Sequence, residues 1–305
     1  MCNKHNYLIF LGGGLGNQMF QYAAARAIQL ENGGDLVLVT HFFDQDPDNR
    51  TYRLNKLNLP KEIRLSKPEE WNKIWFYYRL RKKILFNLMN KAENPEYCFK
   101  RGLYYVDPAY TFYDICTSIK NTNYIYGAFQ TEKYFKKYTK QILSELTVNT
   151  QINQKNINML KKIQSSNSVC LHIRRGDYIA DRYSKLLNIC SKDYYEQAVK
   201  IVINKFDDPC FFCFSNTSED VEWIRKNYNL PENTIYVDLG NEDYDELRLM
   251  YSCKHFILSN SSFSWWAQEL SDNCANKLVI APDRWINNYE ERMDIYKDQW
   301  ILIKP

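Results

Sequence analysis

Short apolar runs alternate with amphipathic segments along most of the chain. Near the start, residues 7–11 form an apolar run, residues 12–18 are rich in glycine, and residues 19–30 repeat apolar side chains at helical spacing. A second apolar run follows at 36–39. A strand, a glycine-rich turn, a helix and a second strand in this order are typical of a βαβ unit.

The remaining apolar and amphipathic segments extend this pattern. In the first half we expect a loop at 44–68, helices at 69–91 and 131–146, and strands at 104–106 and 124–126. In the second half, strands are predicted at 169–173, 210–214, 234–237, 255–259 and 277–280, with helices at 193–206, 218–228, 245–252 and 262–271. Such alternation predicts parallel sheets that are covered by helices on both faces. The fold class is therefore α/β, with two Rossmann-like domains, 1–150 and 151–305, that face a central cleft.

Composition narrows the function classes. A length of 305 residues suits two domains, and a net charge of +4 is too small to predict a nucleic-acid partner. The nine cysteines show no disulfide framework, and Cys170, Cys210 and Cys213 lie in apolar runs. We therefore expect reduced thiols. Because the sequence shows neither a secretory signal nor a membrane span, we expect a soluble, cytoplasmic protein.

The densest group of charged side chains is the sequence LHIRRGDY at 171–178. A buried strand is predicted to end here, so Arg174 and Arg175 lie where open α/β sheets bind ligands. A guanidinium group binds a diphosphate through two parallel hydrogen bonds. His172 lies on the same face of the strand as Arg174. The alternative is an exposed ion-pair cluster of Arg174, Arg175 and Asp177.

The glycine-rich turn does not match a dinucleotide-binding fingerprint or a phosphate-binding P-loop. Asn17 and Met19 occupy positions where the G-x-G-x-x-G spacing requires glycine, and no Walker lysine follows. Backbone N–H groups at the start of the following helix suit an anion or a closely approaching sugar. A tight turn without a ligand is the alternative.

A third cluster, SNSSFSWW at 259–266, opens a predicted helix. Its hydroxyl groups suit either helix capping or binding of phosphate and ribose. We expect Trp265 and Trp266 to pack in the core rather than to stack on a sugar. The Asp-x-Asp pairs at 44–48 and 243–245 lie in a loop and at a helix start, and arginines are available to neutralise a diphosphate. We therefore expect no metal and no other cofactor.

Residues 73–91 combine lysine and arginine with aromatic and aliphatic side chains at helical spacing. An ordinary surface helix is the simpler interpretation. Weak contact with an anionic membrane surface is the alternative, particularly with a lipid-linked acceptor.

Taken together, these motifs resemble those of bacterial α-1,2-fucosyltransferases. The resemblance rests on GGGLGNQMFQYA at 12–23, GAFQTEKYF at 127–135, HIRRGDY at 172–178, SNSSFSWW at 259–266 and APDRW at 281–285. They follow one another in order over nearly the whole chain. The segment 214–223 is slightly longer than the family's usual acidic segment.

The resemblance implies a GT-B-like fold, GDP-L-fucose as donor, a galactose-containing glycan as acceptor, and transfer with inversion and without metal. It also implies that the first domain binds the acceptor and the second binds the nucleotide. By similarity, the donor-binding residues are His172, Arg174, Arg175, Gly14, Gly16, Asn17, Asp245, Ser261, Ser262 and Phe263. Glu246 is a second candidate, beside Asp245, for the acidic residue that recognises guanine.

The predicted mechanism assigns two catalytic residues. Arg174 stabilises negative charge on the leaving diphosphate, with Arg175 either assisting it or bracing the loop. Asp177 is a candidate base for the acceptor hydroxyl, although it could instead hold Arg175 in place. Asp181 is a weaker candidate, and a mechanism without a base is the remaining alternative. Two other hypotheses stay open: a metal-independent GT-B enzyme that uses a different nucleotide sugar, and a non-catalytic glycan-binding protein.

Overall fold

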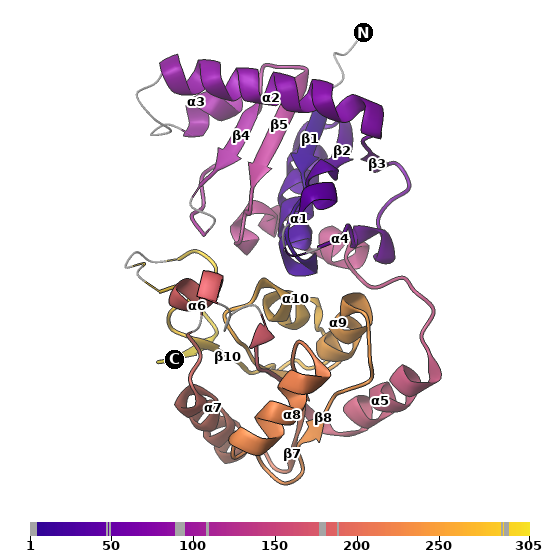
Figure 1. Ribbon diagram of the computed structural model, residues 1–305, viewed down its shortest axis with the longest axis vertical. Coiled ribbons are helices and arrows are strands. Elements are labelled where there is room, and N and C mark those ends of the chain that lie inside the picture. Colours follow the sequence, from indigo (N-terminus) through magenta and orange to yellow (C-terminus); the bar gives the residue numbers. More distant parts are fainter. Residues whose placement is uncertain are drawn as a thin grey trace. The chain divides into compact units, whose positions relative to one another are not determined.

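The computed structural model describes residues 5–46, 48, 50–88, 95–107, 110–176, 181–187, 189–287, 289 and 293–305. The chain forms two compact units (Figure 1). Unit 1 comprises Met1–Leu146 and Met293–Ile295, and unit 2 comprises Thr147–Arg292 and Tyr296–Pro305. The return of residues 293–295 to unit 1 was not predicted. Within unit 1, the Asp294 carboxylate accepts a hydrogen bond from the backbone N–H of Phe112 and pairs with Lys133.

Unit 1 is built on a five-stranded parallel sheet with the order β3-β2-β1-β5-β4. Its strands are β1 (Asn6–Phe10), β2 (Asp35–Val39), β3 (Arg64–Leu65), β4 (Leu103–Val106) and β5 (Thr122–Gly127). Its α-helices are α1 (Leu15–Asn32), α2 (Pro68–Leu88), α3 (Pro95–Lys100) and α4 (Thr139–Glu145). Short 3₁₀ turns are η1 (His41–Gln45), η2 (Leu54–Lys56), η3 (Glu132–Tyr134) and η4 (Lys136–Tyr138).

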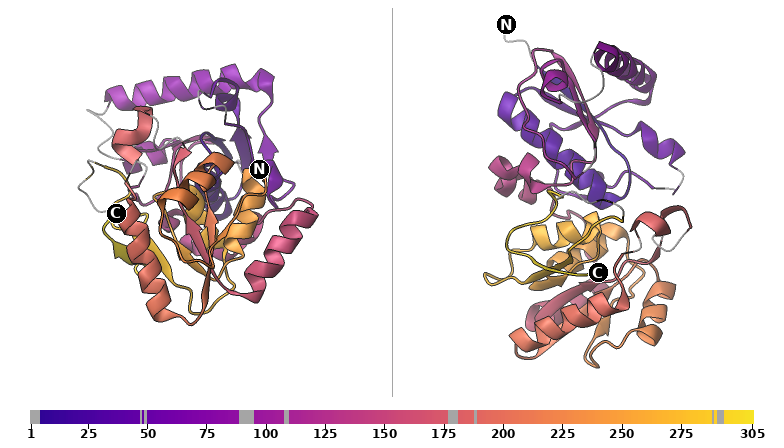
Figure 2. Two further views of the ribbon diagram at one scale, coloured as in Figure 1. Left: turned by 60° about the horizontal axis from the view of Figure 1, so that its bottom comes forward. Right: turned by 90° about the vertical axis from the view of Figure 1, so that its left-hand side faces the viewer.

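Helices cover both faces of this sheet. Side chains alternate between the faces of a strand, and in β1 Leu8 and Phe10 pack in one core with Ile74, Tyr78 and Leu85 of α2. The helix α1 contacts β1 and β2 and lies on the other side of the strands, as the right-hand view of Figure 2 shows. The sheet is therefore the middle layer of unit 1.

Unit 2 has a six-stranded parallel sheet with the order β11-β10-β9-β6-β7-β8. Its strands are β6 (Asn167–His172), β7 (Pro209–Phe214), β8 (Ile235–Tyr236), β9 (His255–Ile257), β10 (Val279–Pro282) and β11 (Ile301–Ile303). Its helices are α5 (Gln154–Ser165), α6 (Asp181–Leu187), α7 (Lys192–Lys205), α8 (Ser218–Asn227), α9 (Asp243–Tyr251) and α10 (Ser262–Leu270).

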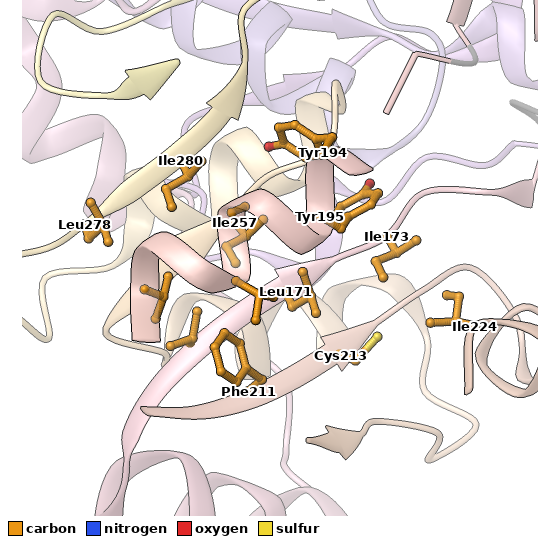
Figure 3. Packing of buried hydrophobic residues seen from close by; sticks show 14 residues of the cluster. Leu171, Ile173, Tyr194, Tyr195, Phe211, Cys213, Ile224, Ile257, Leu278 and Ile280 are labelled. Carbon is orange, nitrogen blue, oxygen red and sulfur yellow. The ribbon is translucent and has the colours of Figure 1, made fainter. Parts of the chain in front are cut away.

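One apolar cluster lies between α7 and this sheet. Tyr194 and Tyr195 of α7 belong to the same cluster as Leu171 of β6, Phe211 of β7 and Ile257 of β9 (Figure 3). All five side chains are almost completely buried. The Tyr194 hydroxyl donates to the carbonyl of Leu258 at 2.5 Å, so its polar atom is satisfied within the core.

Most predicted strands and helices are present within a few residues of their expected bounds. The predicted single helix at 131–146 is wrong in its first half, which forms η3 and η4 before α4 begins. Tyr134 and Phe135 are both buried there, and Phe135 leaves helical geometry at φ −126°. The region 44–68, predicted as a loop, contains η2 and β3. The predicted packing role of Trp265 and Trp266 is confirmed, because both are fully buried.

A buried ion pair connects α1 to α4 in unit 1. The Arg26 guanidinium donates to both carboxylate oxygens of Glu145, with Nη2 2.8 Å from Oε1. The Tyr22 hydroxyl donates to the same carboxylate at 2.6 Å. The side chains of Arg26 and Glu145 are 5% and 7% exposed. Burial and this hydrogen bond raise the pKa of Tyr22, so the phenol stays protonated.

We expect Glu145→Ala to lower the free energy of unfolding by about 3–5 kcal/mol, because it leaves a buried guanidinium without its partner. Glu62 also pairs with Arg26, at 3.5 Å, but it is 65% exposed. Glu62→Ala is therefore the control and should cost about 0–1 kcal/mol. Urea unfolding measures both. Equal effects of the two substitutions would contradict the structural role of Glu145.

Candidate functional site

Arg174 lies two residues beyond the carboxyl end of β6 and is half-buried. His172, the last residue of β6, is only 3% exposed. Its Nδ1 lies 2.9 Å from the Ser259 hydroxyl, and its ring centroid lies 6.2 Å from that of Phe263. Burial, with a smaller effect from Arg174, lowers the pKa of His172 to about 3. At neutral pH the His172 imidazole is therefore uncharged and serves as a hydrogen-bonding group.

Arg175 has a different role from Arg174. Its Nε donates to the Asp220 carboxylate at 3.2 Å, and its guanidinium carbon lies 3.3 Å from the centroid of the Trp223 ring. Its backbone N–H donates to the Asn216 side chain. The other oxygen of Asp220 accepts from the backbone N–H of Gly176. Arg175 thus braces the loop after β6 against α8.

The segment after β9 begins α10. The Ser261 hydroxyl accepts from the backbone N–H of Phe263 and caps the helix, as one of the two predicted alternatives requires. The Asn260 amide donates to the carbonyls of Leu187 and Trp285, at 3.0 Å each. Ser262 and Phe263 are half-buried at the start of the helix. They are the members of this segment that solvent reaches.

The two acidic candidates for guanine recognition, Asp245 and Glu246, have different surroundings. The Asp245 carboxylate accepts from the Thr150 hydroxyl at 3.4 Å and lies 3.5 Å from Nη1 of Arg248. The Glu246 carboxyl is influenced by Arg174 and also acts on the buried thiol of Cys213 on β7. Glu246 is therefore within electrostatic reach of Arg174. Desolvation of its carboxyl raises its pKa to about 8, although Arg174 favours the ionised form.

In unit 1, the three predicted residues of the glycine-rich turn lie at the start of α1. Gly14 is the N-cap, Gly16 is buried, and Asn17 is half-buried. The Gln130 amide, which follows β5, donates to Oδ1 of Asn17 at 2.9 Å. A side chain at Gly14 would meet the Arg50 guanidinium, because a Cβ atom there would lie 2.6 Å from Nη1. The structure thus adds Arg50 to this turn, which no sequence motif indicated.

A cavity of about 330 Å³ opens at the carboxyl edge of the unit 1 sheet. The glycine-rich turn and the ends of β1, β4 and β5 form its wall, with aromatic rings beside one carboxylate and one amide. The lining residues are Phe10, Gly12, Gln21, Phe42, Tyr105, Val106, Asp107, Tyr126, Gly127 and Ala128. A second cavity in unit 1, about 380 Å³, has Asp114 among its lining residues.

Asp177, the candidate base, lies outside the described residues. In the part of the chain that the structure describes, no three His, Cys, Asp or Glu side chains converge as a metal site. The Asp46 carboxylate accepts the backbone N–H groups of Asp48 and Arg50, so it shapes its own loop. Among the described residues, no helix combines the length and hydropathy of a membrane span.

Both candidate sites lie where the strand order reverses. In unit 2 the chain runs from β6 through β7 to β8 on one side and later adds β9 and β10 on the other. In unit 1, β1 likewise separates β2 from β5. Open α/β sheets bind ligands at such switch points, outside the carboxyl ends of the strands. Arg174 and Ser262 follow β6 and β9, and the glycine-rich turn and Gln130 follow β1 and β5.

Comparison with known proteins agrees with this arrangement. Residues 2–304 match the family described as glycosyl transferase family 11. The chain belongs to this family. The resemblance to α-1,2-fucosyltransferases is thereby confirmed, and the protein is a glycosyltransferase.

Two relatives from Escherichia coli match over nearly the full length. An α-1,2-colitosyltransferase is 30% identical over 300 residues, which cover 96% of this chain and 97% of the relative. The O-antigen biosynthesis glycosyltransferase WbnK is 29% identical over 95% of this chain and 98% of its own. The fucosyltransferase NodZ from Bradyrhizobium is 12% identical, with a TM-score of 0.51 over 90% of this chain and 97% of that chain. This likeness shows the fold, which is GT-B-like as predicted.

The raised pKa of Glu246 predicts a pH dependence of stability. A carboxyl group with a folded-state pKa of about 8, well above its ordinary value, binds its proton more tightly in the folded protein. Wild-type stability should therefore fall as pH rises from about 4.5 to about 8. Glu246→Gln removes this loss, so its melting temperature relative to wild type should rise across that window.

Differential scanning fluorimetry at several pH values measures this effect. The matched control is Glu232→Gln, which removes an exposed carboxylate from the same unit. If the difference in melting temperature between Glu246→Gln and wild type stays constant from pH 5 to pH 8, the raised pKa of Glu246 is contradicted.

Proposed function

We propose that this family 11 enzyme transfers L-fucose from GDP-β-L-fucose to the 2-hydroxyl of a galactose-type residue, with inversion and without metal. The observation that carries the proposal is the position of Arg174, at the carboxyl end of β6 and at the switch point beside β9. The start of α10 follows β9 and offers backbone N–H groups with the positive end of its dipole.

This pairing of a guanidinium with a helix start suits a diphosphate leaving group. As the bond to the anomeric carbon breaks, negative charge builds on the diphosphate, and fixed donors stabilise that charge without reorganisation. Arg175 holds the loop through Asp220 and Trp223, so Arg174 is presented from a braced backbone. Neutral His172 with Ser259 is proposed to position the nucleotide. Metal ions are not required, because the arginine and the helix supply the positive charge.

Glu246 rather than Asp245 is the proposed guanine-binding residue. Guanine offers two N–H donors on its Watson–Crick edge, which a single ionised carboxylate can accept together. The Asp245 carboxylate already contacts Thr150 and Arg248. Glu246 is within electrostatic reach of Arg174, and donation from guanine would favour its ionised form.

A second sugar is a candidate for the group that the enzyme transfers. The full-length relative from Escherichia coli at 30% identity is a colitosyltransferase, and colitose is L-fucose without its 3-hydroxyl. GDP-colitose is therefore the alternative donor. The two are separated by kcat/KM for each donor, since a site that hydrogen-bonds a hydroxyl discriminates strongly against the analogue that lacks it.

We expect Arg174→Ala to lower turnover with GDP-fucose by about 100-fold or more without unfolding the protein. Arg175→Ala is the comparison: it should lower the melting temperature, because it removes the contacts with Asp220 and Trp223. Transfer to methyl β-galactoside, assayed in EDTA, measures the effect on turnover.

Three results of this assay would contradict the proposal. Near-normal turnover of Arg174→Ala would show that this residue does not stabilise the diphosphate. If EDTA abolishes wild-type transfer and Mg²⁺ restores it, the enzyme depends on a metal. A much higher kcat/KM with GDP-colitose than with GDP-fucose would identify GDP-colitose as the donor.

The cavity beside the glycine-rich turn is the proposed acceptor site. Its volume of about 330 Å³ is in the usual range for small-ligand pockets. The rings of Tyr126 and Phe42 offer apolar surface for a sugar ring, and the exposed carboxylate of Asp107 can accept its hydroxyl groups. The Tyr126 ring also stacks with the rings of Tyr78 and Tyr105, at centroid distances of 5.4 and 5.8 Å, which fixes its orientation.

Asp107→Asn should raise KM for methyl β-galactoside by about 10-fold, since a hydrogen bond to a charged group is lost. Affinity for GDP, measured by calorimetry, should stay unchanged. Asp114→Asn, an exposed carboxylate at the second cavity, is the matched control. An increase in KM for Asp114→Asn alone would move the acceptor site to that cavity.

A further inference from the structure

The outward face of α2 carries an exposed row of large apolar side chains. Phe76, Leu80 and Ile84 follow one another at intervals of four residues, and Tyr77 lies beside them. Their exposed fractions are 61%, 43%, 48% and 48%, in the order Phe76, Leu80, Ile84, Tyr77. Residues four apart lie on one side of a helix. The row is therefore a continuous apolar strip in contact with solvent.

This strip is separate from the core of unit 1. Ile74, Tyr78 and Leu85 of the same helix are buried against the sheet. A surface helix of a globular protein normally presents polar side chains opposite its buried face. In α2 both faces carry large apolar residues, so packing against the sheet does not account for the outer strip.

The helix α2 carries cations along the apolar strip, and its acids, Glu69 and Glu70, lie in the first turn. Lys73, Arg79 and Lys83 are exposed on α2, and the sequence has no Asp or Glu from residue 71 to residue 88. The other two cations of this stretch, Arg81 and Lys82, contact residues in and beside the strands β4 and β5. Arg81 donates to the carbonyls of Gly102 and Thr122, and the Lys82 ammonium lies 3.9 Å from the centroid of the Tyr105 ring.

We propose that this face of α2, formed by Phe76, Tyr77, Leu80 and Ile84 with Lys73, Arg79 and Lys83, docks unit 1 on an anionic lipid bilayer. Apolar side chains enter the headgroup region, while lysine and arginine beside them contact anionic headgroups. The positive charge of this face favours an anionic bilayer over a second copy of the chain as its partner. Two identical faces in a symmetric dimer would bring these like charges together, because the acids of α2 lie in its first turn and not beside Arg79 and Lys83.

Binding to vesicles tests the proposal without reference to sugar transfer. The full-length protein should co-sediment with vesicles that contain phosphatidylglycerol, and much less with vesicles of phosphatidylcholine alone. Phe76→Ser/Leu80→Ser should weaken binding by at least 10-fold, since two apolar side chains leave the interface. Arg79→Gln/Lys83→Gln should also weaken it by at least 10-fold.

Each variant has a matched control in unit 2. Ile203→Ser/Leu302→Ser removes two apolar residues that are 47% and 41% exposed. Lys161→Gln/Lys226→Gln removes two exposed cations and leaves the same net charge as the α2 variant. Both controls should bind vesicles as wild type does.

Three results would overturn the proposal. Wild-type protein that does not bind anionic vesicles excludes the membrane role. Equal weakening in the α2 variants and in their controls means that overall charge or hydropathy, and not this face, governs binding. A dimer by light scattering that Phe76→Ser/Leu80→Ser converts to a monomer, without vesicle binding, assigns the face to self-association.

Discussion

In each unit, the strand at which the strand order reverses pairs in parallel with a neighbour on either side. This strand is β1, between β2 and β5, in unit 1 and β6, between β7 and β9, in unit 2. This pairing brings the loops that follow neighbouring strands to one edge of the sheet. The glycine-rich turn and Gln130 meet in unit 1, and His172 and Ser259 meet in unit 2. Neither site would exist if the strand order did not reverse at β1 and β6, because the loops would then be separated by further strands.

Two pairs of residues that are adjacent in the sequence have different surroundings in unit 2. Arg175 is held by a carboxylate and an indole ring, whereas its neighbour Arg174 lies toward Glu246 and the buried His172. Asp245 likewise contacts Thr150 and Arg248, while Glu246 is within electrostatic reach of Arg174. In both pairs one residue fixes the backbone and the other is proposed to contact the donor. Fixed charges of this kind stabilise a developing diphosphate charge at little reorganisation cost.

Much of the fold could be predicted from the sequence, since apolar runs and helical periodicity determine β6, β7, α7 and the βαβ unit at the start. The two 3₁₀ turns at 132–138 could not, because their geometry depends on burying Tyr134 and Phe135 together. The motifs also indicated Arg174 and the glycine-rich turn as candidate site residues, and these assignments stay predictions. The motifs could not separate Asp245 from Glu246 or find Arg50, because those assignments depend on helix orientation and on contacts distant in sequence.

Hydrogen exchange with mass spectrometry, with and without GDP, tests directly whether the loops after β6 and β9 bind the nucleotide. We expect slower exchange of backbone amides in peptides that cover residues 172–176 and 259–263 when GDP is added. Peptides from the outer helix α5 should exchange at the same rate in both conditions. GDP binding that leaves 172–176 and 259–263 unprotected would contradict the proposed nucleotide site.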